Sequence, residues 1–169
     1  LPPLPDDTSV DAGTSLAVAS AATVEEDVVV GAAKREQSLG NVASAVTVVS
    51  GDRLRRLGYR TVAEALRGVA GVYVVDDHYT ERVGVRGLQV VGDFNTRLLL
   101  LIDGATVNEP WNQFAGYGWD APVAIDDIAR IEVIRGPVSS VYGTNAFFGI
   151  VNIVTRGATE TPRAWGRVQ

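Results

Sequence analysis

Residues 108–120 concentrate aromatic rings and carboxamides in one irregular stretch of the chain. Aromatic rings offer flat faces for stacking, and carboxamides both donate and accept hydrogen bonds. Such a set could recognise a ligand without reacting with it, or the rings could instead pack inside the protein. The residues concerned are Trp111, Asn112, Gln113, Phe114, Tyr117 and Trp119. Residues 76–81 and 88–96 are also irregular and add the weaker candidates Tyr79, Phe94 and Asn95. We call these three stretches the apex segments.

No group of residues has the spacing of a catalytic or metal site. His78 is the only histidine and the chain has no cysteine, whereas a protein metal site needs several convergent ligands. The sequence has no phosphate-binding glycine loop, no Gly-x-Ser-x-Gly elbow and no zinc motif. We therefore expect no metal, no cofactor and no enzymatic activity.

Composition narrows the class of protein further. With 169 residues and 46% hydrophobic residues, the chain can form one domain with a core. A net charge of -5 argues against a nucleic-acid partner, which needs a basic face. The longest apolar run, residues 98–102, is far shorter than the ~20 residues of a spanning helix. We expect this chain to be soluble by itself and, since it has no methionine, to be a piece of a longer protein.

Apolar patterning predicts the elements that carry the apex segments. Strands are expected over residues 45–50, 72–75, 82–86, 97–102, 105–107, 130–135 and 150–155. Residues 97–102 are apolar on both faces, which predicts a central strand that is covered on both sides. The Asp103–Gly104 pair predicts a tight hairpin turn after it. Together with two short helices, these strands predict an α+β fold with one mixed sheet and helices on one face.

The two predicted helices have clear boundaries. Residues 52–58 form a short helical stretch that Gly58 closes. Thr61 and Glu64 have the spacing of a capping box, in which each side chain accepts a hydrogen bond from the backbone of the other residue. Gly71 is the expected stop after this second helix.

Four motifs occur in one order along the chain. They are the strand and helix of residues 45–72, Val85-Arg-Gly-Leu88, Leu99-Leu-Leu-Ile-Asp-Gly104, and the block of residues 128–156 that contains Arg135-Gly-Pro137 and Tyr142-Gly143. In this order they resemble the plug domain of TonB-dependent outer-membrane receptors, over residues 24–158. The resemblance implies the α+β plug fold, a small mixed sheet with two short helices, with the barrel absent from this chain.

The resemblance also divides the chain. Residues 1–23 are expected to be a flexible N-terminal tail, since they combine prolines, acids and small residues. Residues 24–40 correspond to the TonB-box segment and a linker, and residues 41–158 to the plug. Residues 159–169 are expected to be the start of the first barrel strand or a C-terminal tail.

By this resemblance the plug gates the lumen of its own or a partner β-barrel, and its apex segments contact an extracellular substrate. That substrate could be a small molecule such as a siderophore or a cobalamin, a glycan or a peptide. The location implied is the cell outer membrane, with the N-terminal box facing the periplasm. The other interpretation that we keep is a free-standing periplasmic binding or adaptor module with a plug fold and no transport role.

A short valine-rich run precedes the predicted plug and corresponds to the family's TonB box: Glu26, Asp27, Val28, Val29, Val30 and Gly31. A tethered peptide that favours the β conformation can add a strand to the sheet edge of a partner, here the TonB C-terminal domain. Alternatively, residues 28–30 are simply an N-terminal strand of the plug sheet.

Two arginines, Arg86 and Arg135, each precede a glycine at the end of a predicted strand. In related plugs, arginines and acids near such positions lock the plug to the barrel wall, and Glu132 could belong to the same network. Arginine–carboxylate pairs suit this role because they are bidentate and directional. The alternative is that these are ordinary surface arginines.

Overall fold

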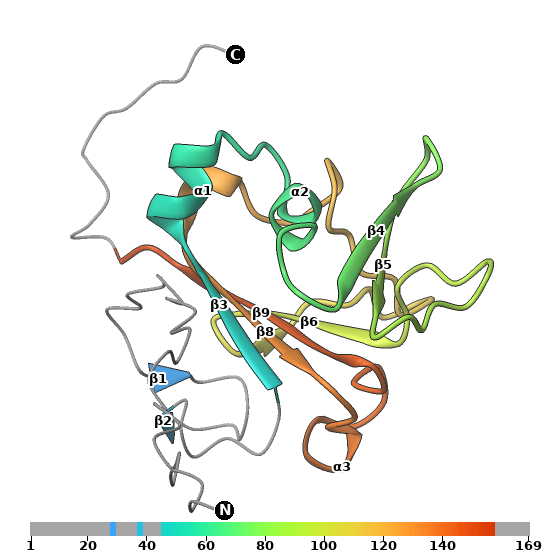
Figure 1. The fold of residues 1–169 in the computed structure, drawn as a ribbon. Helices are drawn as coiled ribbons and strands as arrows, with labels where there is room; N and C mark the ends of the chain where they lie inside the picture. The colour runs from blue at the N-terminus through green and yellow to red at the C-terminus, as the bar shows by residue number, and fades with distance from the viewer. Residues whose placement is uncertain (1–27, 30–36, 39–44, 158–169) are drawn as a thin grey trace, which may run out of the picture.

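Five strands form the central sheet, in the order β3-β8-β9-β6-β7 (Figure 1). The computed structural model describes residues 28–29, 37–38 and 45–157. The strands of this sheet are β3 (Ala45–Ser50), β6 (Leu98–Ile102), β7 (Ala105–Thr106), β8 (Ile128–Arg135) and β9 (Gly149–Thr155). β6 and β9 run parallel, while the other neighbours are antiparallel, so the predicted mixed sheet is confirmed.

β6 is apolar along its length because both of its faces are covered. Residues Leu98 to Leu101 are at most 3% exposed, as the sequence pattern predicted. As predicted, β6 lies inside the sheet, between β9 and β7, although β9 is the middle strand and β7 has only two residues. The turn between β6 and β7 is made by Asp103 and Gly104, whose φ angles of 48° and 79° fit a tight hairpin.

Two helices pack on one face of the sheet, as predicted. α1 (Gly51–Leu57) ends at Gly58, whose φ of 68° is left-handed. α2 (Val62–Leu66) begins at Thr61, whose hydroxyl accepts a hydrogen bond from Glu64 N at 3.1 Å. The other half of the predicted capping box differs, because the Glu64 carboxylate accepts from Arg60 N at 2.7 Å instead of from Thr61 N.

The two faces of the sheet support separate apolar clusters. The larger cluster lies under the helices and joins Leu54 and Leu66 to sheet residues such as Ile131 and Ile153. The smaller one lies on the opposite face and joins Ile134 and Ile150 to the connection between β8 and β9. That connection carries a short helix, α3 (Ser139–Tyr142), which the sequence analysis missed. The 3₁₀ turn η2 (Ile125–Asp127) leads into β8.

The hairpin of β4 (Val72–Asp76) and β5 (Glu81–Val85) is a two-stranded sheet of its own. The prediction of a single sheet was therefore wrong for these two strands. The hairpin packs on the helix-covered side of the central sheet through Val72, Val83 and Val85. The Tyr73 ring lies over its cross-strand partner Gly84, where no side chain competes for the space.

β1 (Val28–Val29) pairs antiparallel with β2 (Gln37–Ser38), and neither belongs to the central sheet. Val28 and Val29 are therefore not a strand of that sheet. The remaining residues of the expected box (Glu26, Asp27, Val30 and Gly31), the expected tail at 1–23 and the segment 159–169 lie outside the described residues.

Candidate functional site

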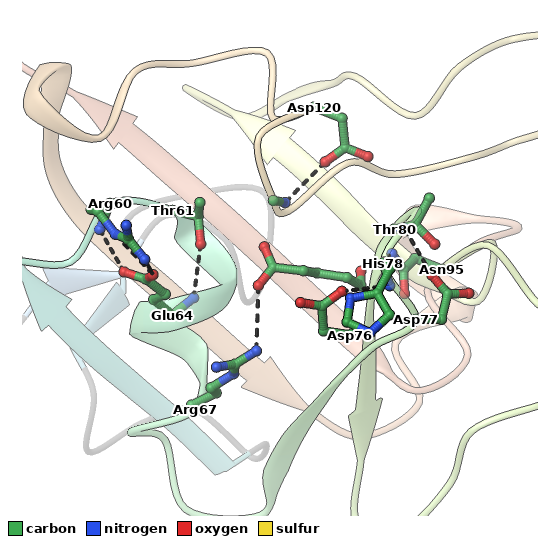
Figure 2. A network of polar contacts seen from close by, with 12 residues as sticks. Arg60, Thr61, Glu64, Arg67, Asp76, Asp77, His78, Thr80, Asn95 and Asp120 are labelled. Carbon is green, nitrogen blue, oxygen red and sulfur yellow. Dashed lines mark hydrogen bonds and ion pairs between the residues drawn. The ribbon is translucent and has the colours of Figure 1, made fainter.

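The tip of the β4–β5 hairpin is held by an aspartate. The Asp77 carboxylate accepts a hydrogen bond from Thr80 N at 2.8 Å (Figure 2). It also accepts from Tyr79 N at 3.0 Å and pairs with Arg82. The two backbone donors lower the pKa of Asp77. Tyr79 is 94% exposed, so a firmly hydrogen-bonded turn presents this ring to solvent.

Asn95 was predicted to contact substrate, but it lies inside the protein at 5% exposure. Its Oδ1 accepts from Val83 N at 2.8 Å, and its Nδ2 donates to Glu81 O at 3.0 Å and Ala115 O at 2.9 Å. The site prediction is corrected here because the amide is fully occupied by three backbone groups. Asn95 instead joins the three apex segments to each other.

Tyr117 is also corrected. Its side chain is fully buried, its hydroxyl donates to Leu98 O at 3.4 Å, and burial raises its pKa well above the ordinary value. Its carbonyl accepts from Ala63 N at 2.7 Å, at the start of α2. The alternative interpretation, a ring packed inside the protein, therefore holds for Tyr117, which anchors the third apex segment to the core.

Asn108 is a structural residue that the sequence analysis missed. Its Oδ1 accepts from Leu100 N at 2.8 Å, and its Nδ2 donates to Gln113 O at 3.0 Å. The side chain thus continues the hydrogen bonding of β6 and closes the loop of residues 108–114. The only sequence signal is an asparagine directly after a short strand, a place where such side chains often replace backbone partners.

The remaining apex candidates lie at the surface, although not in one patch. Trp111 is 90% exposed, Trp119 is 73% exposed, Phe94 is 47% exposed and Phe114 is half-buried. Asn112 and Gln113 line one hollow of about 490 Å³. Trp119 lines another of about 490 Å³, beside Arg60 and the start of α2. The Arg60 guanidinium lies 5.7 Å from the centre of the Trp119 ring, within cation–π range.

Two of the three residues expected in the lock meet. Arg86 Nη2 donates to Arg135 O at 3.0 Å, and Arg135 Nη2 donates to Thr47 Oγ1 at 3.0 Å. Arg135 Nη1 also donates to Ala70 O. The two guanidinium groups therefore tie β8 to β3, to the turn between α2 and β4 and to the hairpin, within the chain itself.

Glu132 does not share this arrangement. Side chains alternate along β8, so Glu132 points to the face opposite Arg135. Its carboxylate is fully buried and accepts from Arg130 Nε at 2.9 Å and Asn152 Nδ2 at 3.0 Å. The prediction that Glu132 joins Arg86 and Arg135 is thereby corrected.

A family model described as the TonB-dependent receptor plug domain matches residues 38–150. The chain belongs to this family. Within the described residues, the plug has no helix that is both long and apolar enough to cross a membrane, and no group of three acidic, histidine or cysteine side chains arranged to hold a metal ion.

Similar proteins are much longer than this plug. The plug is 35% identical over 142 residues to the iron-regulated outer membrane virulence protein of Vibrio cholerae serotype O1. The aligned region covers 80% of this chain and 21% of that protein. The plug is also 32% identical over 130 residues to the vitamin B12 transporter BtuB of Photobacterium profundum. Here the aligned region covers 76% of this chain and 20% of that protein. The plug thus spans about a fifth of the length of these relatives.

Solved structures agree with this assignment. The ferric yersiniabactin uptake receptor FyuA of Yersinia pestis superimposes with a TM-score of 0.53 and 25% identity, over 68% of this chain and 17% of that one. A mutant of the ferric enterobactin receptor PfeA of Pseudomonas aeruginosa, solved with enterobactin, gives a TM-score of 0.52 and 27% identity, over 69% and 18%. The plug fold predicted from the sequence is confirmed.

Glu81, the last residue of the first apex segment, is a partly buried carboxylate whose pKa is raised. Arg67 Nη2 donates to its Oε1 at 3.4 Å (Figure 2), while Oε2 is buried next to Gly118 without a hydrogen-bond partner in the described residues. Burial raises the pKa of Glu81, and the charges of Asp76 and Glu64 add to this, against the opposing effects of the Thr61 hydroxyl and of the Arg67 charge.

This shift predicts a pH dependence. Because the pKa of Glu81 is raised in the folded plug, its contribution to stability is complete below the unfolded-state value of about 4.3. That contribution is lost as the pH rises through the folded-state pKa. Glu81→Gln removes the titrating group, so we expect the variant to gain stability relative to the wild type between pH 4 and pH 7. Urea unfolding at both pH values measures this.

The exposed Glu109 supplies the control, since Glu109→Gln changes the net charge equally without a buried carboxyl. We expect the difference in the free energy of unfolding between Glu109→Gln and the wild type to stay nearly constant between pH 4 and pH 7. If Glu81→Gln instead loses stability relative to the wild type on going from pH 4 to pH 7, the ion pair with Arg67 outweighs the effect of burial.

Proposed function

We propose that this plug gates the lumen of an outer-membrane β-barrel and is coupled to the TonB C-terminal domain through residues 26–31. The observation that carries the proposal, beside membership of the plug family, is the place of Val28 and Val29. Among the described residues they pair within a small two-stranded ladder and are separate from the central sheet. A strand in that position can leave its partner without breaking the core.

The coupling follows from the chemistry of a β-prone peptide. Main-chain N–H and C=O groups of residues 26–31 add as a strand to the sheet edge of TonB, and the alternating side chains set the register. The peptide is covalently joined to β3 at the edge of the central sheet. Force applied to the peptide is thereby delivered to the plug.

The apex residues that reach the surface contact an extracellular substrate in this proposal. They are the exposed Tyr79, Phe94, Trp111, Asn112, Gln113 and Trp119 and the half-buried Phe114. The substrate classes open to it are a small molecule such as a ferric siderophore or a cobalamin, a glycan and a peptide. The similar proteins support transport across the outer membrane, since one is an iron-regulated outer membrane protein and another a vitamin B12 transporter. No enzymatic step is part of the proposal.

Arg86 and Arg135 form the lock to the barrel wall. Their guanidinium groups already hold the end of β8, so a carboxylate of the wall would find cations that are fixed in position. Arg135 Nε is buried and has no acceptor among the described residues, so a contact with the wall would have to come from the remaining N–H groups of the two guanidinium groups.

The test is a proline at Val29. Proline removes a backbone donor and blocks a β ladder, so Val29→Pro is expected to abolish capture of the chain by an immobilised TonB C-terminal domain. Val91→Pro is the matched control, because Val91 is 97% exposed in an apex segment far from the box in sequence. It should be captured like the wild type.

The conservative Val29→Thr keeps the backbone donor and the β propensity, and it should be captured as well. Capture that is unchanged by Val29→Pro, or equally lost in Val91→Pro, would contradict the proposed role of residues 26–31.

A further inference from the structure

One hollow of about 490 Å³ is formed by three parts of the chain that are distant in sequence. Thr96 and Arg97 precede β6, Asn112 and Gln113 come from the third apex segment, and residues 144–148 precede β9. The last of these segments contributes Thr144, Asn145, Phe147 and Phe148. The volume is within the range of about 300–1,000 Å³ typical of ligand sites.

The walls of this hollow are fixed to one another. Asn145, only 7% exposed, donates from Nδ2 to Thr96 O at 2.8 Å. Phe148 N donates to Arg97 O at 3.0 Å, which joins the same two segments through the backbone. A ligand entering the hollow therefore meets a surface that is already formed, and little ordering entropy is lost on binding.

The carboxamides of the hollow each use one end for the fold and leave the other end available. Asn112 Oδ1 accepts from Phe114 N at 2.8 Å, and Gln113 Nε2 donates to Pro110 O at 3.2 Å. In the part of the chain that the structure describes, no protein partner occupies Asn112 Nδ2, Gln113 Oε1 or Asn145 Oδ1. The wall thus offers a donor, two acceptors and the Thr144 hydroxyl, which can act as either.

The charge of the hollow is close to neutral. Arg97 is the only charged residue of its lining, and its Nε lies 3.9 Å from Asp93 Oδ2. A metal chelate with several negative charges would find a single cation that already has a counter-ion. Phe147, at 56% exposure, adds an apolar ring at the rim.

We propose that this hollow binds an uncharged saccharide unit. Sugar hydroxyl groups both donate and accept, as the mixed wall of Asn112, Gln113 and Asn145 requires, and the C–H face of a sugar ring can lie on Phe147. The proposal rests on the proposed function, because it names the substrate class of the apex surface, and it extends that surface to residues 144–148.

The experiment is an NMR titration of the isotope-labelled 169-residue chain. The uncharged probes are maltotriose, xylotriose and chitotriose, and gallium(III) citrate is a diamagnetic anionic probe. Each is taken to concentrations on the order of 10 mM, above the ~1 mM dissociation constant of a weak contact. At least one saccharide is expected to shift the side-chain amide resonances of Asn112 and Gln113 and the backbone resonances of residues 144–148.

Two substitutions sharpen the result. Phe147→Ala is expected to weaken saccharide binding by about tenfold, the loss of one ~1.4 kcal/mol contact. Leu57→Ala, which truncates an exposed apolar residue of α1, is expected to leave binding unchanged. Spectra of both free variants that match the wild type outside the mutated residue confirm that they fold.

Shifts at these residues with gallium citrate and none with the three saccharides would overturn the proposal, as would the absence of any shift. Saccharide shifts that persist in Phe147→Ala at unchanged affinity would overturn the assigned position of the ring. A chain that is captured by the TonB domain and binds no saccharide would contradict this inference while leaving the proposed function in place.

Discussion

Replacing Gly149 by alanine is expected to lower the free energy of unfolding by about 3 kcal/mol or more. A Cβ at this position would lie 2.2 Å from the carbonyl oxygen of Ile134, on the neighbouring strand β8. The carbonyl oxygen belongs to the backbone of the central sheet and the Cβ position is fixed by the backbone, so neither atom can rotate away. The φ of 157° is also one that side-chain-bearing residues rarely adopt. Relief requires β8 and β9 to separate at the end of the ladder.

Gly143→Ala is the matched control for this prediction. Gly143 has a φ of 84° and lies in the same β8–β9 connection, but no atom stands within 4 Å of a Cβ built there. With a ψ of -151° it lies in a region that is almost exclusive to glycine, so Gly143→Ala should cost the conformational penalty alone, about 1–3 kcal/mol. Urea unfolding of both variants separates steric overlap from backbone strain. Equal losses in the two variants would mean that the close approach of the strands is not the cause.

Asn95→Ala is expected to destabilise the plug by about 3 kcal/mol or more, because three backbone groups lose their partner at once. In the part of the chain that the structure describes, the Asn95 amide is the hydrogen-bond partner of Val83 N, Glu81 O and Ala115 O. An unsatisfied buried polar group costs about 1–3 kcal/mol. The φ of 61° at this position adds to the penalty for alanine.

Asn112→Ala serves as the comparison for Asn95→Ala. Asn112 is exposed and makes a single local hydrogen bond to Phe114 N, so its loss should cost no more than about 1 kcal/mol. In addition to urea unfolding, amide hydrogen exchange should show faster exchange at Val83 and in residues 115–117 only for Asn95→Ala, whereas Asn112→Ala should affect the amide of Phe114. Exchange that is equally fast in both variants would show that Asn95 does not hold the apex segments together.

The local elements of the fold could be predicted from the sequence because each has a local cause. Runs of β-branched and apolar residues marked β3, β6, β8 and β9. Thr61 and Gly58 marked helix boundaries through capping chemistry, and Asp103–Gly104 marked its turn. The family motifs then supplied the arrangement of these elements, which local patterns do not contain.

Other features depend on contacts between distant residues and could not be predicted in this way. Residues 72–85 have the pattern of strands, but the pattern does not say that they pair only with each other. Tyr117 and Asn95 are residue types that occur in binding loops and also in cores. Only the positions of Leu98, Val83 and Ala115 around them decide that both are buried.

The candidate site changed for the same reason. The sequence analysis treated the 13 residues 108–120 as one aromatic surface. In the structure the buried Tyr117 separates this stretch into two parts that line different hollows, one with Asn112 and the other with Trp119. The contribution of residues 144–148 to the first hollow was invisible in the sequence, because those residues are brought there by the pairing of β9 with β6.

Amide hydrogen exchange of the chain with and without the TonB C-terminal domain is the decisive measurement of how this plug connects to TonB. We predict slower exchange at residues 26–31 on adding the domain, with the amides of β6 and β9 unchanged. Slower exchange along β3 in place of residues 26–31, or no change in any part of the chain, would contradict the claim that a separate N-terminal strand connects this plug to TonB.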